Sequence, residues 1–399
     1  MRSGFGLFIF QKGKSMGRRP TPPSQFPASF VALSGFTLIC FSHLRWDFVF
    51  QRPQHLMRRF AHHSRVLYWE EPVSITDLDE PRLHIRDCPQ TGVRVITPQL
   101  CAAGDPALNG EILKLLLDQH LASEPDPYIR WYYTPMMLPF SEHVPADCVI
   151  YDCMDELANF HGAPPELLPL EQRLLSQADV VFTGGYSLYE AKKDRHRDIH
   201  PVPSSVDVAH FSAARQPRTR ATGHPPRFGF YGVIDERMDL ELLAALADAR
   251  PDWHIEVIGP IVKINPDDLP RRANLHFPGG LTYEELPACV CAWDVALMPF
   301  AINEATRFIS PTKTPEYLAA GKPVVSTPIT DVVRHYGDIE AVFVADRGEA
   351  FIAACEQALT LSHTPGSWLQ EGDLTETDKT PECRFLWLRG LATTETDIR

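Results

Sequence analysis

Short apolar runs rich in β-branched and aromatic residues recur along the first half of the chain. They do not alternate strictly between apolar and polar positions, so both faces of each predicted strand are expected to be buried, as in a parallel sheet. These predicted strands are residues 36–41, 66–69, 93–97, 131–134, 148–152 and 179–183. Helical patterns such as residues 53–62 and 111–121 separate them. Strand–helix alternation of this kind predicts a doubly wound α/β domain.

The same alternation restarts in the second half of the chain. A polar, proline-rich stretch at residues 213–226 has no periodicity and predicts a linker. The strands predicted beyond it are residues 227–232, 254–259, 274–279, 293–298, 323–326 and 341–344, with helices that include 239–249 and 283–291. The pattern therefore predicts an α/β fold of two Rossmann-like, doubly wound domains that face a cleft. The predicted boundaries are 1–34 for a flexible N-terminal extension, 35–205 for the first domain, 206–226 for the linker, 227–362 for the second domain and 363–399 for a divergent tail.

Composition is that of an ordinary globular protein. A length of 399 residues fits two or three domains, and no apolar run approaches the roughly 18 residues of a membrane span. The net charge of −13 makes general nucleic-acid binding unexpected. Nine cysteines are scattered, and the close pair Cys289 and Cys291 has neither zinc-site nor disulfide-framework spacing. A reducing, cytoplasmic location is the expected one.

Positive charge is concentrated near the amino terminus. Residues 1–65 contain ten lysines and arginines and a single acidic residue, Asp47, for a local net charge of +9. Such a region could contact an anionic membrane surface or a phosphate-bearing substrate, and a basic tail beside a solvated helix face is the plainer interpretation. We expect an extension rather than a signal peptide, because no A-x-A-like cleavage site follows the apolar run at residues 26–41.

Candidate binding residues follow the first predicted strand. In open α/β sheets, ligands lie outside the carboxyl ends of the strands, and the loop after residue 41 is rich in groups that contact sugars. Flat aromatic rings pack on sugar rings, and arginine and glutamine donate paired hydrogen bonds. The plainer alternative is that the aromatic side chains belong to the core and the charges are solvated. The acceptor-binding candidates are Arg45, Trp46, Asp47, Gln51 and Arg52, with His43 as a catalytic candidate.

Carboxylates mark the end of another predicted strand. Asp152 ends the strand and Asp155 follows it by three residues. A carboxylate at this place can act as a general base when its pKa and geometry suit the reaction. An aspartate at position 155 can equally cap a helix. We predict Asp152 as the first choice and Asp155 as the second.

Cationic and hydroxyl side chains follow the strands of the second domain. Gly232 allows a tight turn before Arg237, which lies near a helix start where anions bind. Lys263 could reach the cleft from the next strand. The segment that ends in the helix before Gly321 adds positive charge, hydroxyl donors and a carboxylate suited to a pair of ribose hydroxyls. Its donor-site candidates are Glu304, Arg307, Lys313, Thr314 and Glu316, and the whole set predicts a cradle for a nucleotide diphosphate.

These motifs resemble those of a known family. The segments PEYLAAGKPVVSTPI, PSSVDVAHF, FYGVIDERMDLELL and WDVALMPF are similar to motifs of GT-B fold glycosyltransferases of the family 4 type, also called glycosyl transferases group 1. The segments SHLRWDFVFQRPQHL and YDCMDEL resemble a bacterial subgroup of cell-surface polysaccharide assembly. The resemblance covers roughly residues 36–359.

The resemblance implies a nucleotide-sugar-dependent, hexosyltransferase-like enzyme that glycosylates an acceptor hydroxyl. It places Glu316 on the donor ribose, with Arg237, Lys263 and Lys313 on the diphosphate, and it places the acceptor in the first domain. It implies no bound metal or cofactor, a saccharide or lipid-linked acceptor, and a cytoplasmic protein with peripheral membrane contact as an option.

Several positions depart from the family pattern. Phe308 stands where the family has its first glutamate, so Glu304 is the candidate substitute, and Val233 replaces an arginine that binds phosphate. The divergent tail lacks the periodicity of the final helix. These departures leave an alternative open, a catalytically silent sugar-nucleotide-binding protein. A nicotinamide-dependent dehydrogenase is disfavoured, because no G-x-G-x-x-G follows any predicted strand.

Overall fold

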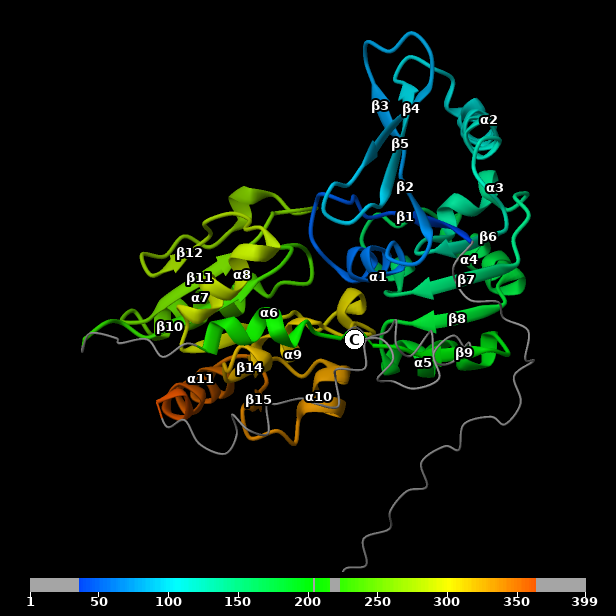
Figure 1. Cartoon of the computed structure of the whole chain (residues 1–399). Helices are drawn as coiled ribbons and strands as arrows, with labels where there is room; N and C mark the ends of the chain where they lie inside the picture. Colours follow the sequence, from blue (N-terminus) through cyan, green and yellow to red (C-terminus); the bar gives the residue numbers. More distant parts are fainter. Residues whose placement is uncertain (1–35, 204, 216–222, 364–399) are drawn as a thin grey trace, which may run out of the picture.

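The computed structural model describes residues 36–203, 205–215 and 223–363. Two sheets, each flanked by helices, lie side by side in Figure 1. The first has the strand order β3-β5-β2-β1-β6-β7-β8-β9, with β4 paired to β5. Its strands are β1 (Thr37–Ser42), β2 (Arg65–Glu70), β3 (Val73–Ile75), β4 (Arg82–Asp87), β5 (Arg94–Cys101), β6 (Tyr128–Tyr132), β7 (Cys148–Cys153), β8 (Val180–Thr183) and β9 (Ile199–Pro201).

Burial on both faces explains why most of these strands pair in parallel. All six residues of β1 and of β7 are buried, which is expected when helices cover both faces of a sheet. The helices are α1 (Arg52–Phe60), α2 (Asn109–Leu121), α3 (Leu138–Ser141), α4 (Leu167–Gln177) and α5 (Tyr186–Lys192). The strands β3, β4 and β9 were not predicted. Antiparallel β4 is largely exposed, and β3, β4 and the end of β5 project at the top of Figure 1.

The second sheet has the order β12-β11-β10-β13-β14-β15, and all its pairs are parallel. Its strands are β10 (Arg227–Tyr231), β11 (His254–Ile258), β12 (Leu275–His276), β13 (Val295–Met298), β14 (Val324–Ser326) and β15 (Val342–Val344). Its helices are α6 (Val208–Ser212), α7 (Leu240–Ala249), α8 (Leu286–Cys291), α9 (Lys313–Ala319), α10 (Thr330–Tyr336) and α11 (Glu349–Ser362). This arrangement confirms the predicted class of two doubly wound α/β domains.

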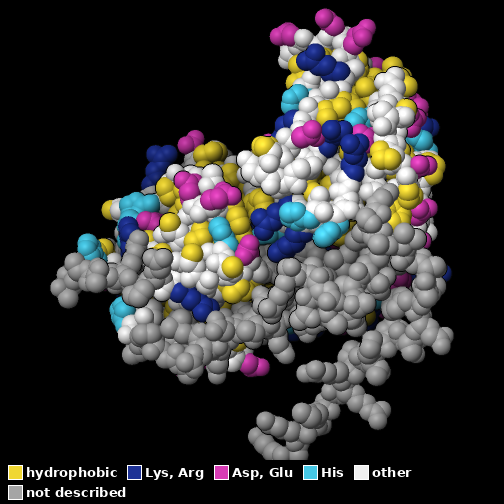
Figure 2. Space-filling view, in the orientation of Figure 1, with side chains coloured by type: hydrophobic (Ala, Val, Ile, Leu, Met, Phe, Trp, Pro, Cys, Tyr) yellow, Lys and Arg dark blue, Asp and Glu magenta, His cyan; other side chains and the backbone are white. Residues whose placement is uncertain are grey.

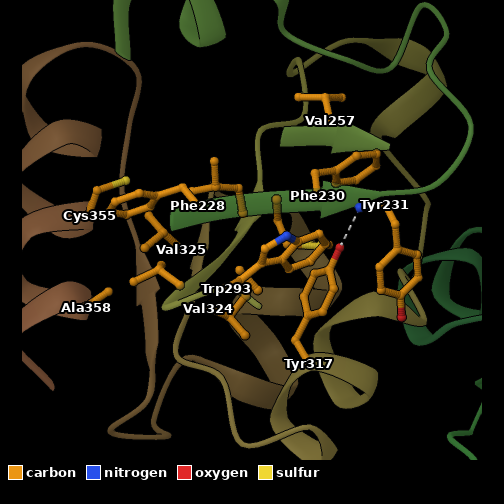
Figure 3. Close-up of a cluster of buried hydrophobic side chains, with 14 of the residues drawn as sticks. Phe228, Phe230, Tyr231, Val257, Trp293, Tyr317, Val324, Val325, Cys355 and Ala358 are labelled. Carbon is orange, nitrogen blue, oxygen red and sulfur yellow. Dashed lines mark hydrogen bonds between the residues drawn. The ribbon is translucent and has the colours of Figure 1, made fainter. Parts of the chain in front are cut away.

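Aromatic side chains fill the core under β10, as Figure 3 shows. Trp293 and Tyr317 are fully buried there, and the Tyr231 amide donates to the Tyr317 hydroxyl at 3.1 Å. Gly229 makes room for the indole, because a Cβ atom at this position would lie 1.9 Å from Trp293 Cε2. The packing at β10 therefore requires glycine at the centre of a strand.

The start of the predicted linker is packed into the second domain. Residues 208–212 form α6, whose Phe211 is fully buried. Val206 and Ala214 belong to the same hydrophobic core as β10 and β13. The chain therefore joins the second core at the start of the predicted linker.

The two domains contact each other through α5 and α10. The carboxylate of Asp331, on α10, accepts hydrogen bonds from the backbone amides of Tyr186 and Ser187 at 2.9 Å each. A Cβ atom at Gly185 would lie 2.3 Å from Asp331 Oδ2 and 2.5 Å from Ser310 Cβ. The second domain thus caps a helix of the first, at a place where no side chain fits.

Candidate active site

Two glycines bring the carboxyl ends of β10 and β11 close together. Gly232 and Gly259 have φ values of +143° and +152°, which side chains rarely adopt. A Cβ atom at Gly259 would lie 1.8 Å from the Gly232 carbonyl oxygen, and one at Gly232 would lie 2.3 Å from Lys313 Cε. The backbone and the lysine therefore approach each other without an intervening side chain.

Helix α9 presents Lys313 and Glu316 one turn apart, beside this glycine turn. Lys313 Nζ lies 5.6 Å from the ring centre of Phe230, and burial lowers the pKa of the lysine while Glu316 opposes the shift. The Tyr231 hydroxyl donates to the Glu316 carboxylate. Burial raises the pKa of Glu316 to about 7, against the opposing influence of Lys313. A buried carboxylate and a partly buried cation are thus adjacent on one turn of α9.

Arg237 lies on the loop after β10 and is fixed by Asp235. Its Nε and Nη2 atoms donate to the Asp235 carboxylate at 2.9 and 2.7 Å. The Arg237 guanidinium carbon lies 5.5 Å from the ring centre of Phe160, which belongs to the first domain. Lys263 Nζ lies 5.4 Å from the same ring, and Lys263 has φ +63°. Arg237 and Lys263, two of the three cations predicted to bind the diphosphate, therefore face the first domain.

Asp155 faces these cations from the first domain. Burial raises the pKa of its carboxyl to about 6, and Arg237 and Lys313 act in the opposite direction. A carboxyl with this pKa is ionised at neutral pH and can accept a proton. Of the two predicted carboxylates, Asp155 is the one placed among the charges of the second domain.

His43, like Asp155, belongs to the first domain. Burial and the positive charge of Lys263 lower its pKa to about 4, so the ring is neutral at neutral pH. Its Nδ1 atom is buried and has no hydrogen-bond partner among the described residues.

Asp152, the first choice of catalytic base, forms a buried ion pair with Arg52. Arg52 Nε and Nη2 lie 2.9 and 2.8 Å from the two Asp152 oxygens, and the side chains are 2% and 0% exposed. Arg52 Nη1 donates to the Val202 carbonyl at 2.6 Å. Because the Asp152 carboxylate is paired with Arg52 and has no access to solvent, the pair ties α1 to β7.

The other residues predicted to bind the acceptor make contacts within the first domain, and Gln51 also lines the cavity beside Glu316. Trp46 is 6% exposed and packs edge-on against Tyr68 at 4.9 Å, so its ring is not offered to a sugar. Arg45 pairs with Glu70 at 3.2 Å. Asp47 is exposed and pairs with Arg86, and Gln51 caps α1 through a capping box with Gln54.

Of the other predicted residues of the donor loop, Glu304 and Arg307 are exposed and Thr314 is buried. Glu304 and Arg307 form an exposed ion pair at 3.3 Å. Thr314 is fully buried, and its hydroxyl has no hydrogen-bond partner among the described residues. Phe308, at the family's glutamate position, packs against the hydrophobic core of the first domain.

A cavity at the junction of the two domains contains Glu316. Lys, Arg and His side chains gather on the surface where α1 meets the second domain (Figure 2). Gln51 and Arg52, predicted from the sequence as binding residues, line this cavity, whereas the rest of α1 and the segment before α6 were not predicted. The residues that line the cavity include Phe50, Gln51, His55, Arg59, Asp207 and Glu316. Burial lowers the pKa of His55 to about 3. The position of His55 one turn into α1 is the only signal that could have identified it.

The GT-B class is defined by two α/β domains that share a cleft. In this chain the strand ends of the second domain also carry a glycine turn, cations and a carboxylate. Residues 225–360 match the glycosyl transferases group 1 family model. A Bacillus subtilis (strain 168) protein, TuaH, assigned to teichuronic acid biosynthesis as a glycosyltransferase, is 27% identical over 249 residues. That alignment covers 57% of this chain and 63% of the relative. Residues 225–360 therefore match the family that the sequence motifs predicted.

Solved structures show the same fold. WaaG, a glycosyltransferase of lipopolysaccharide biosynthesis, has a TM-score of 0.61 at 15% identity over 88% of this chain and all of its own. Anabaena HepE in complex with UDP has a TM-score of 0.60 at 12% identity over 89% of this chain and 97% of its own. Sucrose-phosphate synthase from Thermosynechococcus elongatus has a TM-score of 0.62 at 14% identity, over 86% of this chain and 93% of its own.

Proposed function

We propose that the protein transfers a sugar from a nucleotide diphosphate sugar to an acceptor hydroxyl in the assembly of a cell-surface polysaccharide or glycolipid. The observation that carries the proposal is the convergence of Lys313, Glu316 and Arg237 at the strand ends of the second domain, opposite Asp155. The family match of the second domain supports the same reaction.

The second domain would bind the donor. Glu316 offers its carboxylate to the ribose hydroxyls, and Gly232 lets the backbone approach the phosphates. Arg237, Lys263 and Lys313 would stabilise the charge that develops on the leaving diphosphate, in the place where other enzymes use a metal ion. Such cations are effective because they are positioned before the reaction begins.

The first domain would bind the acceptor. As the acceptor oxygen bonds to the anomeric carbon, the bond from that carbon to the diphosphate breaks, and we assign the acceptor proton to the Asp155 carboxylate. Asp155 replaces Asp152 in this role, because Asp152 is locked to Arg52. The neutral ring of His43 is available nearby as a hydrogen-bonding group for the acceptor.

The relatives indicate which substrates to test first. HepE was crystallised with UDP and glucose, and TuaH and WaaG are assigned to teichuronic acid and lipopolysaccharide synthesis. We therefore propose a UDP-sugar donor and a saccharide or lipid-linked acceptor, used in the cytoplasm. None of the helices in the described ranges is long and apolar enough to cross a membrane.

We also propose a peripheral membrane contact through the basic end of α1, where Arg58 and Arg59 are partly exposed and His62 is exposed. Sedimentation with vesicles of anionic and of neutral lipids tests this contact. Equal recovery of protein with both kinds of vesicle would contradict it.

Mass spectrometry of products formed from a panel of nucleotide sugars and acceptors tests the reaction itself. Lys313→Ala and Glu316→Ala should each lower turnover at least tenfold, whereas Lys114→Ala on α2 serves as a matched control away from the site. Near-normal rates in both site variants would refute the assignment of the donor site.

A further inference from the structure

The loop that follows β7 reaches across the domain boundary. The side-chain amide of Asn159 donates to the Glu304 carbonyl at 3.1 Å. The backbone amide of His161 donates to the Glu236 carboxylate at 3.0 and 3.2 Å. Between these two residues, the Phe160 ring contacts Arg237 and Lys263 of the second domain. Three consecutive residues of the first domain therefore contact the second domain, which carries the candidate donor site.

The base of this loop is rigidly held. Glu156 pairs with Lys192 at 2.7 Å, and Lys192 is only 1% exposed. The same ammonium pairs with Glu171 at 2.7 Å, and Arg195 also pairs with Glu171. A buried network of this kind fixes its members in one arrangement, because releasing any of them leaves a charge without a partner.

The contacts of Phe160 leave both cations able to bind an anion. An aromatic face attracts a cation through its quadrupole and accepts no proton from it. Asp235 occupies the Nε and Nη2 atoms of Arg237, so Arg237 Nη1 and the Lys263 ammonium are the groups that would donate to phosphate oxygens. A ring that contacts two cations also restricts where their flexible side chains can go, which lowers the entropy lost when a ligand binds.

We propose that Phe160 is a positioning residue of the donor site, which orients Arg237 and Lys263 for the diphosphate from the opposite domain. This inference rests on the proposed function, and it extends the donor site into a domain expected to bind only the acceptor. Donor binding and domain closure are then coupled, because Phe160 contacts the two cations, one of them already held by Asp235, when the loop at residues 159–161 lies on them.

Calorimetric titration with UDP, GDP, ADP and TDP tests the proposal on purified full-length protein. Phe160→Leu keeps an apolar side chain of similar size and removes the aromatic face, so it should weaken binding of the preferred diphosphate about five- to tenfold. Phe160→Trp should restore the affinity, because its ring also attracts cations. In an Arg237→Ala background, Phe160→Leu should have a much smaller effect. Leu168→Ala, an exposed apolar position on α4, is the matched control.

Hydrogen exchange on the wild-type protein gives a second measurement that needs no variant. Bound diphosphate should slow exchange of the His161 amide, whose bond to Glu236 crosses the boundary. Equal or tighter binding by Phe160→Leu, or unchanged exchange at His161, would overturn the role of Phe160 while leaving the donor site in place. Failure of the wild type to bind any of the four diphosphates would overturn the proposed function and this inference together.

Discussion

Replacing Arg52 with methionine should destabilise the first domain by about 3–5 kcal/mol, the usual cost of removing one partner of a buried ion pair. The geometry supports the upper part of this range. Arg52 donates hydrogen bonds of 2.9 Å to Asp152 Oδ2 and 2.6 Å to the Val202 carbonyl, and its Nη2 atom lies 2.8 Å from Asp152 Oδ1 in the ion pair. Neither side chain is more than 2% exposed, so water cannot replace the lost donors.

Removing both charges should lower the free energy of unfolding by less than the sum of the two single changes. Arg52→Met with Asp152→Asn leaves no unpaired buried charge, so the double variant should recover at least about 2 kcal/mol relative to the sum of the single variants. Urea unfolding followed by tryptophan fluorescence measures these differences, because the first domain buries Trp69 and Trp131.

Two results would refute this reasoning. A loss of under 1 kcal/mol in Arg52→Met would mean that the pair is not the closed, desolvated contact described here. A hundredfold loss of turnover in Asp152→Asn at unchanged stability would return Asp152 to the role of catalytic base. The prediction thus separates a structural carboxylate from a chemical one.

Other perturbations follow from the same contacts. In the wild type, kcat/KM should rise with pH through about 6, where the Asp155 carboxyl loses its proton. Asp155→Asn should remove this acid limb of the pH–rate profile. An acid limb that persists in the variant would identify a different base. Lys192→Met should lower the free energy of unfolding by about 3 kcal/mol, because Glu156 and Glu171 lose their shared partner; a urea midpoint equal to that of the wild type would show that the network adds no stability. Gly229→Ala should cost about 1–3 kcal/mol through the clash with Trp293, and thermal unfolding at the wild-type temperature would contradict the packing shown in Figure 3.

Elements with dense apolar patterns could be predicted from the sequence, because burial on both faces leaves a continuous local signal. Each predicted strand overlaps an observed one. The strand β4, with the sequence RLHIRD, has only two apolar residues, and its pairing with β5 depends on a partner that its own sequence does not specify. Strand β9 has three residues, too few for a pattern.

The candidate donor residues could be grouped from the sequence because they lie close in sequence to a strand end or to a helix start. Lys313 and Glu316 share one turn of a helix, so their proximity is local. The errors concern contacts between distant segments. Arg52 and Asp152 are separated by one hundred residues, and the burial of Trp46 depends on Tyr68 in another strand. Residue type alone could not distinguish a saturated arginine from one that faces a ligand.

The cap that Asp331 places on α5 limits how the two halves can be recombined. The amides at the helix start need the carboxylate, and position 185 admits no side chain while Asp331 and Ser310 lie against it. A chimera that takes its donor half from a relative would have to bring an aspartate to position 331 and keep the glycine at position 185. These two residues, 146 positions apart, therefore form a compatibility pair that has to be inherited or engineered together.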